Sequence, residues 1–274
     1  MTAAASQVRF TASRAANSKP LEYLARAGFV CYGIIHLLFA WVAFQVAFGD
    51  SSQEGDQTGA MQKLATQPLG KVLLVVIVIG MVALALWQGL EAAIGESGVR
   101  STRAKFERVV NGVRAVVYLW LAWTAYQVVQ GASSSQAQGS KNATSQLMNS
   151  AGGRIWVGLL GLVVVGVGIG LIWYGLKKKF EERLNTERMS FRVRRTVRRL
   201  GMAGYTAKGI AYGIAGILLV VAAAKYDANK ASGLDGALKA LASQAFGPWL
   251  LSLVAIGIAA FGIYCFFQAR YRRV

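Results

Sequence analysis

The sequence predicts an all-α integral membrane protein with six transmembrane helices, built as three tandem two-helix repeats. Three observations support this prediction: 55% of the 274 residues are apolar, only 15% are charged, and long stretches have no charge. A soluble domain would contain about 25% charged residues, whereas a spanning helix needs roughly 17–25 mostly apolar residues. Several such stretches, separated by polar segments, therefore favour a membrane protein over a soluble fold with a buried core.

Each charge-free stretch is interpreted as one spanning helix. The predicted spans are 27–48, 70–93, 109–131, 154–176, 203–225 and 247–269. The fifth of these is short between its charges, so Lys208 and Lys225 must extend their ammonium groups toward its two ends. The spans define repeats at 21–95, 104–178 and 201–274, with an N-terminal tail at 1–20 and a linker at 179–200.

The distribution of positive charge predicts the orientation. The polar, basic tail lacks the apolar region of a cleavable signal peptide. If this tail is cytoplasmic, 21 of the 30 Lys and Arg residues fall on the same side, including Arg270, Arg272 and Arg273 of the C-terminal tail. Because basic loops stay in the cytoplasm, both termini are predicted to be cytoplasmic. The net charge of +18 is thus a topology signal, and we expect no nucleic-acid partner.

An internal repeat sets the architecture. Gly59–Leu74 aligns without a gap on Gly236–Leu251, with eight identities in sixteen positions. The middle copy aligns more weakly, and its Ser- and Gln-rich loop at 132–152 has lost most of this segment. Because each copy crosses the membrane twice, every copy enters the membrane from the same side. This predicts a pseudo-three-fold axis normal to the membrane and excludes an inverted repeat.

These features resemble the bacterial domain-of-unknown-function family twelve-oh-six, which has three tandem two-helix membrane domains. The resemblance covers roughly residues 24–273, and its most specific motif begins at Gly233 and ends at Leu250. The Gly-aromatic pair, basic residue and tyrosine that open odd helices in this family match Gly204, Tyr205, Lys208 and Tyr212. The first copy departs, with Tyr32 and His36 in the last two places, and the second has Val110 and Asn111 for the pair. The resemblance implies a bacterial plasma-membrane protein and no established activity.

Polar residues within the predicted spans are the first candidates for function. His36, Tyr118 and Tyr212 occupy equivalent positions in the three copies, on a face that also contains small residues. An ionisable residue inside a membrane suggests function, but a neutral imidazole bonded to a tyrosine or a carbonyl would be structural. Gln45 and Gln127 lie deeper in their helices and are expected to form bonds across helices.

Basic residues give a second set of candidates. Arg114 and Lys208 are equivalent to Tyr32, and either extend to lipid headgroups or surround an anion. Arg192, Arg195 and Arg199 belong to a segment in which apolar residues recur at helical spacing. This segment is predicted to be a basic amphipathic helix on the inner leaflet, where it would bind anionic lipids, with a solvated linker as the alternative.

Small residues predict close helix packing, and the remaining residue types exclude several functions. The candidate packing residues are Gly33, Gly158, Gly161, Gly168, Gly209 and Gly213. We expect no enzyme, metal site or cofactor, because no catalytic motif or metal-ligand spacing is present. The preferred function is structural, lipid-interacting or accessory to a membrane complex with an unidentified protein partner. The alternative is a small transporter or channel near the pseudo-axis.

Overall fold

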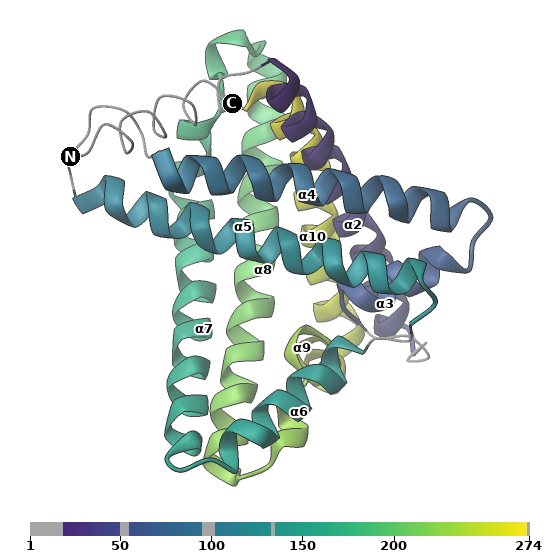
Figure 1. The fold of residues 1–274 in the computed structure, drawn as a ribbon, viewed down its shortest axis with the longest axis vertical. Coiled ribbons are helices and arrows are strands. Elements are labelled where there is room, and N and C mark those ends of the chain that lie inside the picture. Colours follow the sequence, from purple (N-terminus) through teal and green to yellow (C-terminus); the bar gives the residue numbers. More distant parts are fainter. Residues whose placement is uncertain (1–18, 50–54, 95–101, 133–134, 273–274) are drawn as a thin grey trace, which may run out of the picture.

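A computed structural model of the chain describes residues 19–49, 55–94, 102–132 and 135–272, and the described part is helical. The predicted tail at 1–20 lies almost wholly outside these ranges. Each copy consists of a long helix, a short helix and a second long helix (Figure 1). The first copy contains α2 (Lys19–Ala47), α3 (Gln57–Ala65) and α4 (Gly70–Ile94).

The other two copies follow the same order. The second contains α5 (Thr102–Val129), α6 (Gln136–Met148) and α7 (Gly153–Leu176). The third contains α8 (Phe191–Lys225), the 3-10 turn η3 (Ala228–Lys230), α9 (Gly233–Ala242) and α10 (Gly247–Tyr271). Two further 3-10 turns, η1 (Lys179–Arg183) and η2 (Thr186–Arg188), connect α7 to α8. The segment expected as a linker at 179–200 thus becomes helical at Phe191 and continues without a break into the fifth predicted span.

All three copies pass from the short helix to the second long helix through the same turn. The turns are Leu64–Gly70, Leu147–Gly153 and Leu241–Gly247. The residue before each closing glycine has a positive φ, at Leu69, Gly152 and Phe246. A Cβ on any of the three closing glycines would lie within 1.9 Å of a backbone carbonyl oxygen, which only glycine avoids. The middle copy therefore keeps the backbone of this turn, although most of the shared residues are lost there.

The largest helix interfaces join one copy to the next. They pair α4 with α5, α7 with α8, and α10 with α2, so that the last copy closes back on the first. Two pairs share a capping contact from positions that the repeat aligns: Arg26 donates to the carbonyls of Ala269 and Arg270, and Arg108 donates to that of Ala93. A cation at the C-terminal end of a partner helix satisfies carbonyls that the helix leaves unpaired.

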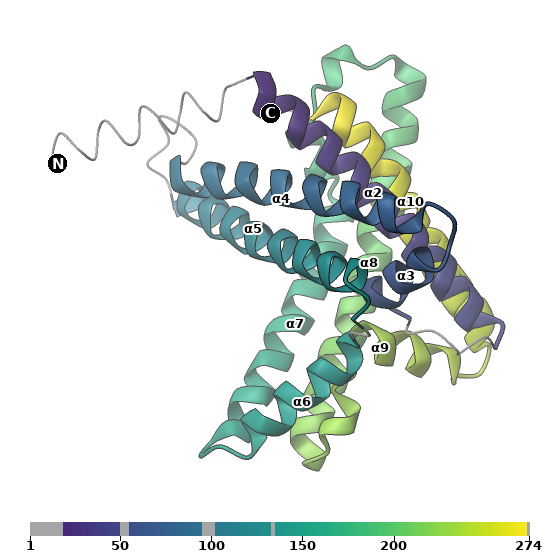
Figure 2. The ribbon, with the colours of Figure 1, turned by 45° about the vertical axis from the view of Figure 1, so that its right-hand side comes forward.

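The three pairs do not run in one direction. In Figures 1 and 2, α4 and α5 cross the α7–α8 pair, and α2 and α10 are inclined to both. We call the end of each pair that carries the repeated turn its turn end, and the opposite end its basic end. The predicted bundle of six helices around one membrane normal is not established by this splayed arrangement.

Packing within a copy differs among the copies. In the first, a Cβ on Gly80 would meet Cys31, and in the third a Cβ on Gly257 would meet the equivalent Ala207. In the second, the equivalent Gly166 has nothing within 4 Å. Over the described residues α5 and α7 make almost no contact, whereas α2–α4 and α8–α10 form substantial interfaces. The ring of copies is therefore loosest inside copy two.

Five helices in the described part are long and apolar enough to span a membrane. They are α2, α4, α7, α8 and α10. The predicted third span, 109–131, is also a helix, but α5 does not meet this criterion. Arg114 and Gln127 interrupt its apolar part, which ends at Val129. The crossing by α5 is consequently the one that composition supports least.

Candidate functional site

The polar centre of the molecule is formed by Tyr32 and His36 of α2 and Lys208 of α8. The Lys208 ammonium donates to the Tyr32 phenol oxygen at 3.1 Å, and its Nζ lies 3.2 Å from His36 Nε2. His36 Nδ1 is 2.9 Å from the Tyr32 carbonyl oxygen one turn earlier. We assign the proton to Nδ1, which then donates to this carbonyl and leaves Nε2 to accept from Lys208. His36 is only 1% exposed.

Aromatic rings surround this triad of Tyr32, His36 and Lys208. Lys208 Nζ lies 4.0 Å from the ring centroid of Phe261 in α10, a cation–π contact. Tyr32 packs edge-on against Tyr118 of α5, with ring centroids 5.2 Å apart. Residues from all three copies therefore meet here. Over the described residues Lys208 has no ion pair with a carboxylate, so the cation is stabilised by a phenol, an imidazole and aromatic faces.

The sequence candidates are only partly brought together. Tyr32, His36, Tyr118 and Lys208 lie together at this centre. Arg114 stays near its own helix, with a contact of 3.4 Å to the Asn111 side chain. Tyr212 packs instead against the neighbouring apolar cluster around Ala211 and Ile258. The Lys208 side chain points toward Tyr32 and His36 of α2.

A second buried cation was not predicted as a site. Arg272, which the charge distribution assigned to the cytoplasmic C-terminal tail, is 6% exposed. Its guanidinium lies 4.9 Å from the Phe29 ring centroid and 4.8 Å from that of Trp87. Burial lowers the pKa of Arg272 below its usual value, and the charges of Arg114 and Arg183 lower it further. No sequence signal reveals this, because burial depends on rings from α2 and α4.

The basic end of the α7–α8 pair presents a charged helical face. Arg192, Arg195 and Arg199 are exposed and lie on one face of α8. Arg198 lies to one side of this face and forms an ion pair with Glu181 at 2.6 Å. The hydrogen bond from Arg198, with the positive charges nearby, lowers the pKa of Glu181. We call Arg192, Arg195 and Arg199 the basic face. Within the described residues, none of the three forms an ion pair with a carboxylate, whereas Arg194 and Arg198 both pair with Glu181.

The two glutamine candidates lie apart. Gln45 accepts a hydrogen bond from Lys63, which connects α2 with α3 of the same copy. Gln127 lines a pocket beside α6. Neither reaches the triad, so the centre contains no amide from these positions.

The glycine candidates differ in what surrounds them. A Cβ on Gly33, Gly161, Gly168 or Gly209 would come within 2.8 Å of a neighbouring helix. A Cβ on Gly158 would make an ordinary contact at 3.7 Å to Ala223, and one on Gly213 would meet open space. The backbone of Gly213 still borders the interface, since the Cβ position of Gly168 is 2.7 Å from its nitrogen. At Gly213 the backbones of α7 and α8 therefore come close together, although a side chain at this position would have room.

Metal binding has no support in the described residues, where no group of three or more His, Cys, Asp or Glu could hold an ion. Cys31 and Cys265 are both buried and unpaired. The site consists of one ammonium, one imidazole and several phenols. These groups can bind an anion or hold a proton, and they can also serve packing alone.

Comparisons with known proteins agree with the repeat. A family model described as a Domain of Unknown Function (DUF1206) matches residues 27–95, 110–178 and 203–272. The chain is 28% identical over 264 residues to the uncharacterised protein YxxB of Bacillus subtilis (strain 168), and this alignment covers 94% of each chain. No solved structure matches significantly.

Proposed function

This chain belongs to the DUF1206 family, and from that premise we propose that it is a structural membrane protein that binds anionic lipids at its basic end. The observation behind the proposal is the basic face of α8. Each Lys or Arg near an anionic membrane surface contributes on the order of 1 kcal/mol to binding. Three arginines on one helical face therefore supply a substantial attraction for anionic headgroups.

The surroundings of the basic face support lipid as its partner. The face directly precedes the apolar part of α8, and the adjoining α7 exposes large apolar side chains along its length, such as Leu160 (51%) and Ile169 (64%). Phe191, at the start of α8, is 81% exposed. Exposed apolar residues beside arginines are the composition of a membrane interface. A headgroup bound here would have its acyl chains beside α7.

The centre of the molecule favours this role over transport. Tyr32, His36, Tyr118 and Phe261 fill it with ring contacts between 4.3 and 6.1 Å. A conducting path near the axis would need polar, water-accessible walls. In our proposal the chain crosses the inner membrane of a bacterium six times, both termini are cytoplasmic, and the triad joins the copies.

The lipid proposal is tested with a triple variant, Arg192→Gln, Arg195→Gln and Arg199→Gln. Wild type and variant are extracted from the same cells, and the retained phospholipids are quantified by mass spectrometry. At about 1 kcal/mol for each arginine, the variant should retain anionic lipid at least tenfold less well. Zwitterionic lipid should change little, because its headgroup has no net charge.

A matched control removes three cations at the turn ends, with Lys71→Gln, Lys141→Gln and Lys225→Gln. This variant should retain anionic lipid as wild type does. Equal retention in both triple variants would contradict the proposal, and so would an equal loss in both. Anion flux into liposomes should also stay at background; flux through the wild type that disappears in Lys208→Gln would favour the channel alternative instead.

A further inference from the structure

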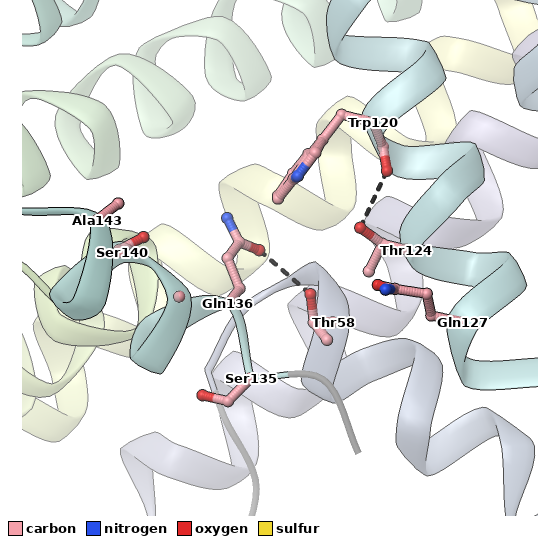
Figure 3. A pocket seen from close by; sticks show the side chains of 9 residues that line it. Thr58, Trp120, Thr124, Gln127, Ser135, Gln136, Ser140 and Ala143 are labelled. Carbon is pink, nitrogen blue, oxygen red and sulfur yellow. Dashed lines mark hydrogen bonds between the residues drawn. The ribbon is translucent and has the colours of Figure 1, made fainter. Parts of the chain in front are cut away.

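A pocket of about 320 Å³, with both polar and apolar surface, lies where α5 and α6 of copy two meet α3 of copy one (Figure 3). α5 contributes Trp120, Thr124 and Gln127, and α6 contributes Gln136 and Ser140. Thr58 of α3 closes the side that faces copy one. The volume lies near the lower limit of small-molecule sites, so a ligand of one or two rings is the appropriate size.

The lining of this pocket is neutral and rich in hydrogen-bonding groups. None of its nine residues is charged; four carry hydroxyls, two carry amides and one is a tryptophan. An ionic ligand would lose its hydration without gaining a counter-charge. A wholly apolar ligand would leave the amides and hydroxyls unpaired. The lining thus favours a neutral ligand with many hydroxyl groups.

Hydrogen-bonding capacity is left over for such a ligand. Thr124 donates to the Trp120 carbonyl at 2.9 Å, so its oxygen can still accept. The Thr58 hydroxyl reaches the Gln136 amide oxygen only at 3.4 Å, a weak contact. Within the described residues the Gln127 side chain forms no hydrogen bond, and Figure 3 shows it directed toward Thr58. An amide can both donate to and accept from a sugar hydroxyl.

Trp120 adds an apolar surface to these polar groups. It is 43% exposed and stands beside Gln136 in Figure 3. Tryptophan presents a large flat face with one polar N–H. A sugar ring has a C–H face and a rim of hydroxyls, which match the indole and the surrounding amides respectively. We infer that this pocket binds a neutral hydroxyl-rich ring, either a free saccharide or the sugar headgroup of a glycolipid.

The inference is tested on full-length protein in phosphatidylcholine nanodiscs, which avoids detergents with sugar headgroups. Maltose is titrated by isothermal calorimetry, and monoglucosyl diacylglycerol is added to the nanodiscs in a separate arm with native mass spectrometry as the readout. Saturable binding of either probe is expected, and the arm that responds identifies the source. Loss of the hydrogen bonds of one amide should weaken binding about five- to tenfold in Gln127→Ala.

Two further variants keep the test decisive. Gln130→Ala alters an exposed amide just past the end of α5 and should bind as wild type does. Thr124→Val keeps the side-chain shape and removes the hydroxyl, so it should also weaken binding if Gln127→Ala does not fold. Absence of saturable binding in both arms would overturn the inference, as would binding that neither Gln127→Ala nor Thr124→Val weakens. The lipid proposal is unaffected by either result, because it concerns α8.

Discussion

Lys208 retains an ammonium group in the interior without a carboxylate to neutralise it in the described part of the chain. Removing such a group from water is costly unless other groups replace its hydration. The Tyr32 phenol oxygen accepts at 3.1 Å and His36 Nε2 at 3.2 Å. The Phe261 ring adds a cation–π contact at 4.0 Å. These partners come from α2 and α10, so the cation fastens the third copy to the first.

The strength of this contact is measured by a double-mutant cycle. Tyr32→Phe removes the phenol that accepts from Lys208 and should lower the free energy of unfolding by about 1.5–3 kcal/mol. In a Lys208→Met background the same change should be nearly neutral, because the charged donor is gone. Thermal or denaturant unfolding in nanodiscs provides the readout. Tyr23→Phe, at a 71% exposed position of the same helix, should change nothing, and additive effects of the two core changes would refute the coupling.

Part of this centre could be predicted from the sequence. The repeat placed Tyr32, Lys208 and Arg114 in register, and His36 with Tyr118 one turn further. What the register cannot supply is which of these side chains meet, since that depends on how the pairs cross. Arg272 was missed because a charge at the chain end normally stays in water, whereas here two rings from other helices enclose it.

At the scale of helices, the α7–α8 interface shows why glycine spacing matters. Gly161, Gly168 and Gly209 face backbone atoms of the opposite helix, so the two backbones approach closely. Close approach allows packing to drive association where apolar burial cannot. Gly166 and Gly170 lie on the same helix but have nothing within 4 Å. The interface thus uses only one face of α7.

This difference yields a matched pair of substitutions. A Cβ at Gly168 would lie 2.7 Å from the Gly209 carbonyl oxygen, and backbone atoms cannot move aside. Gly168→Ala should therefore destabilise the protein by about 1–3 kcal/mol. Gly166→Ala should be neutral or stabilising by up to about 1 kcal/mol, since alanine is the better helix former. Melting of both variants in one detergent checks this, and equal melting temperatures would mean that α7 does not pack here.

Long helices were easier to predict than short ones. The six predicted spans all fall on long helices, because uninterrupted apolar stretches are a strong signal. The short helices α3, α6 and α9 were not predicted: they are 9 to 13 residues long, and apolar residues are the minority in α3 and α6. In the middle copy the turn Leu147–Gly153 keeps its backbone and its two end residues, but the five residues between them differ from those of the first copy, so the sequence alignment did not reveal it.

At the scale of the whole molecule, the three copies form a cyclic set of pairs with one loose joint. α5 and α7, the two long helices of copy two, scarcely touch, and the pocket that Gln127 lines lies beside α5. The same α5 has the weakest support as a span. Whether α5 crosses the membrane decides on which side of the membrane each later segment of the chain lies. Our proposals place the three repeated turns on one side and the basic face on the other.

Labelling of single cysteines is the most direct test of this arrangement. Cysteine is placed at Gln67, Ser150 and Gln244, the exposed equivalent positions of the three turns, and at Tyr23 and Glu187 near the basic ends. Native Cys31 and Cys265 are buried and give little background. We predict that an impermeant thiol reagent labels all three turn positions in intact spheroplasts, and the other two only after permeabilisation. If α5 does not cross, position 67 is labelled from outside together with 187, while 150 and 244 are protected, which would contradict six crossings.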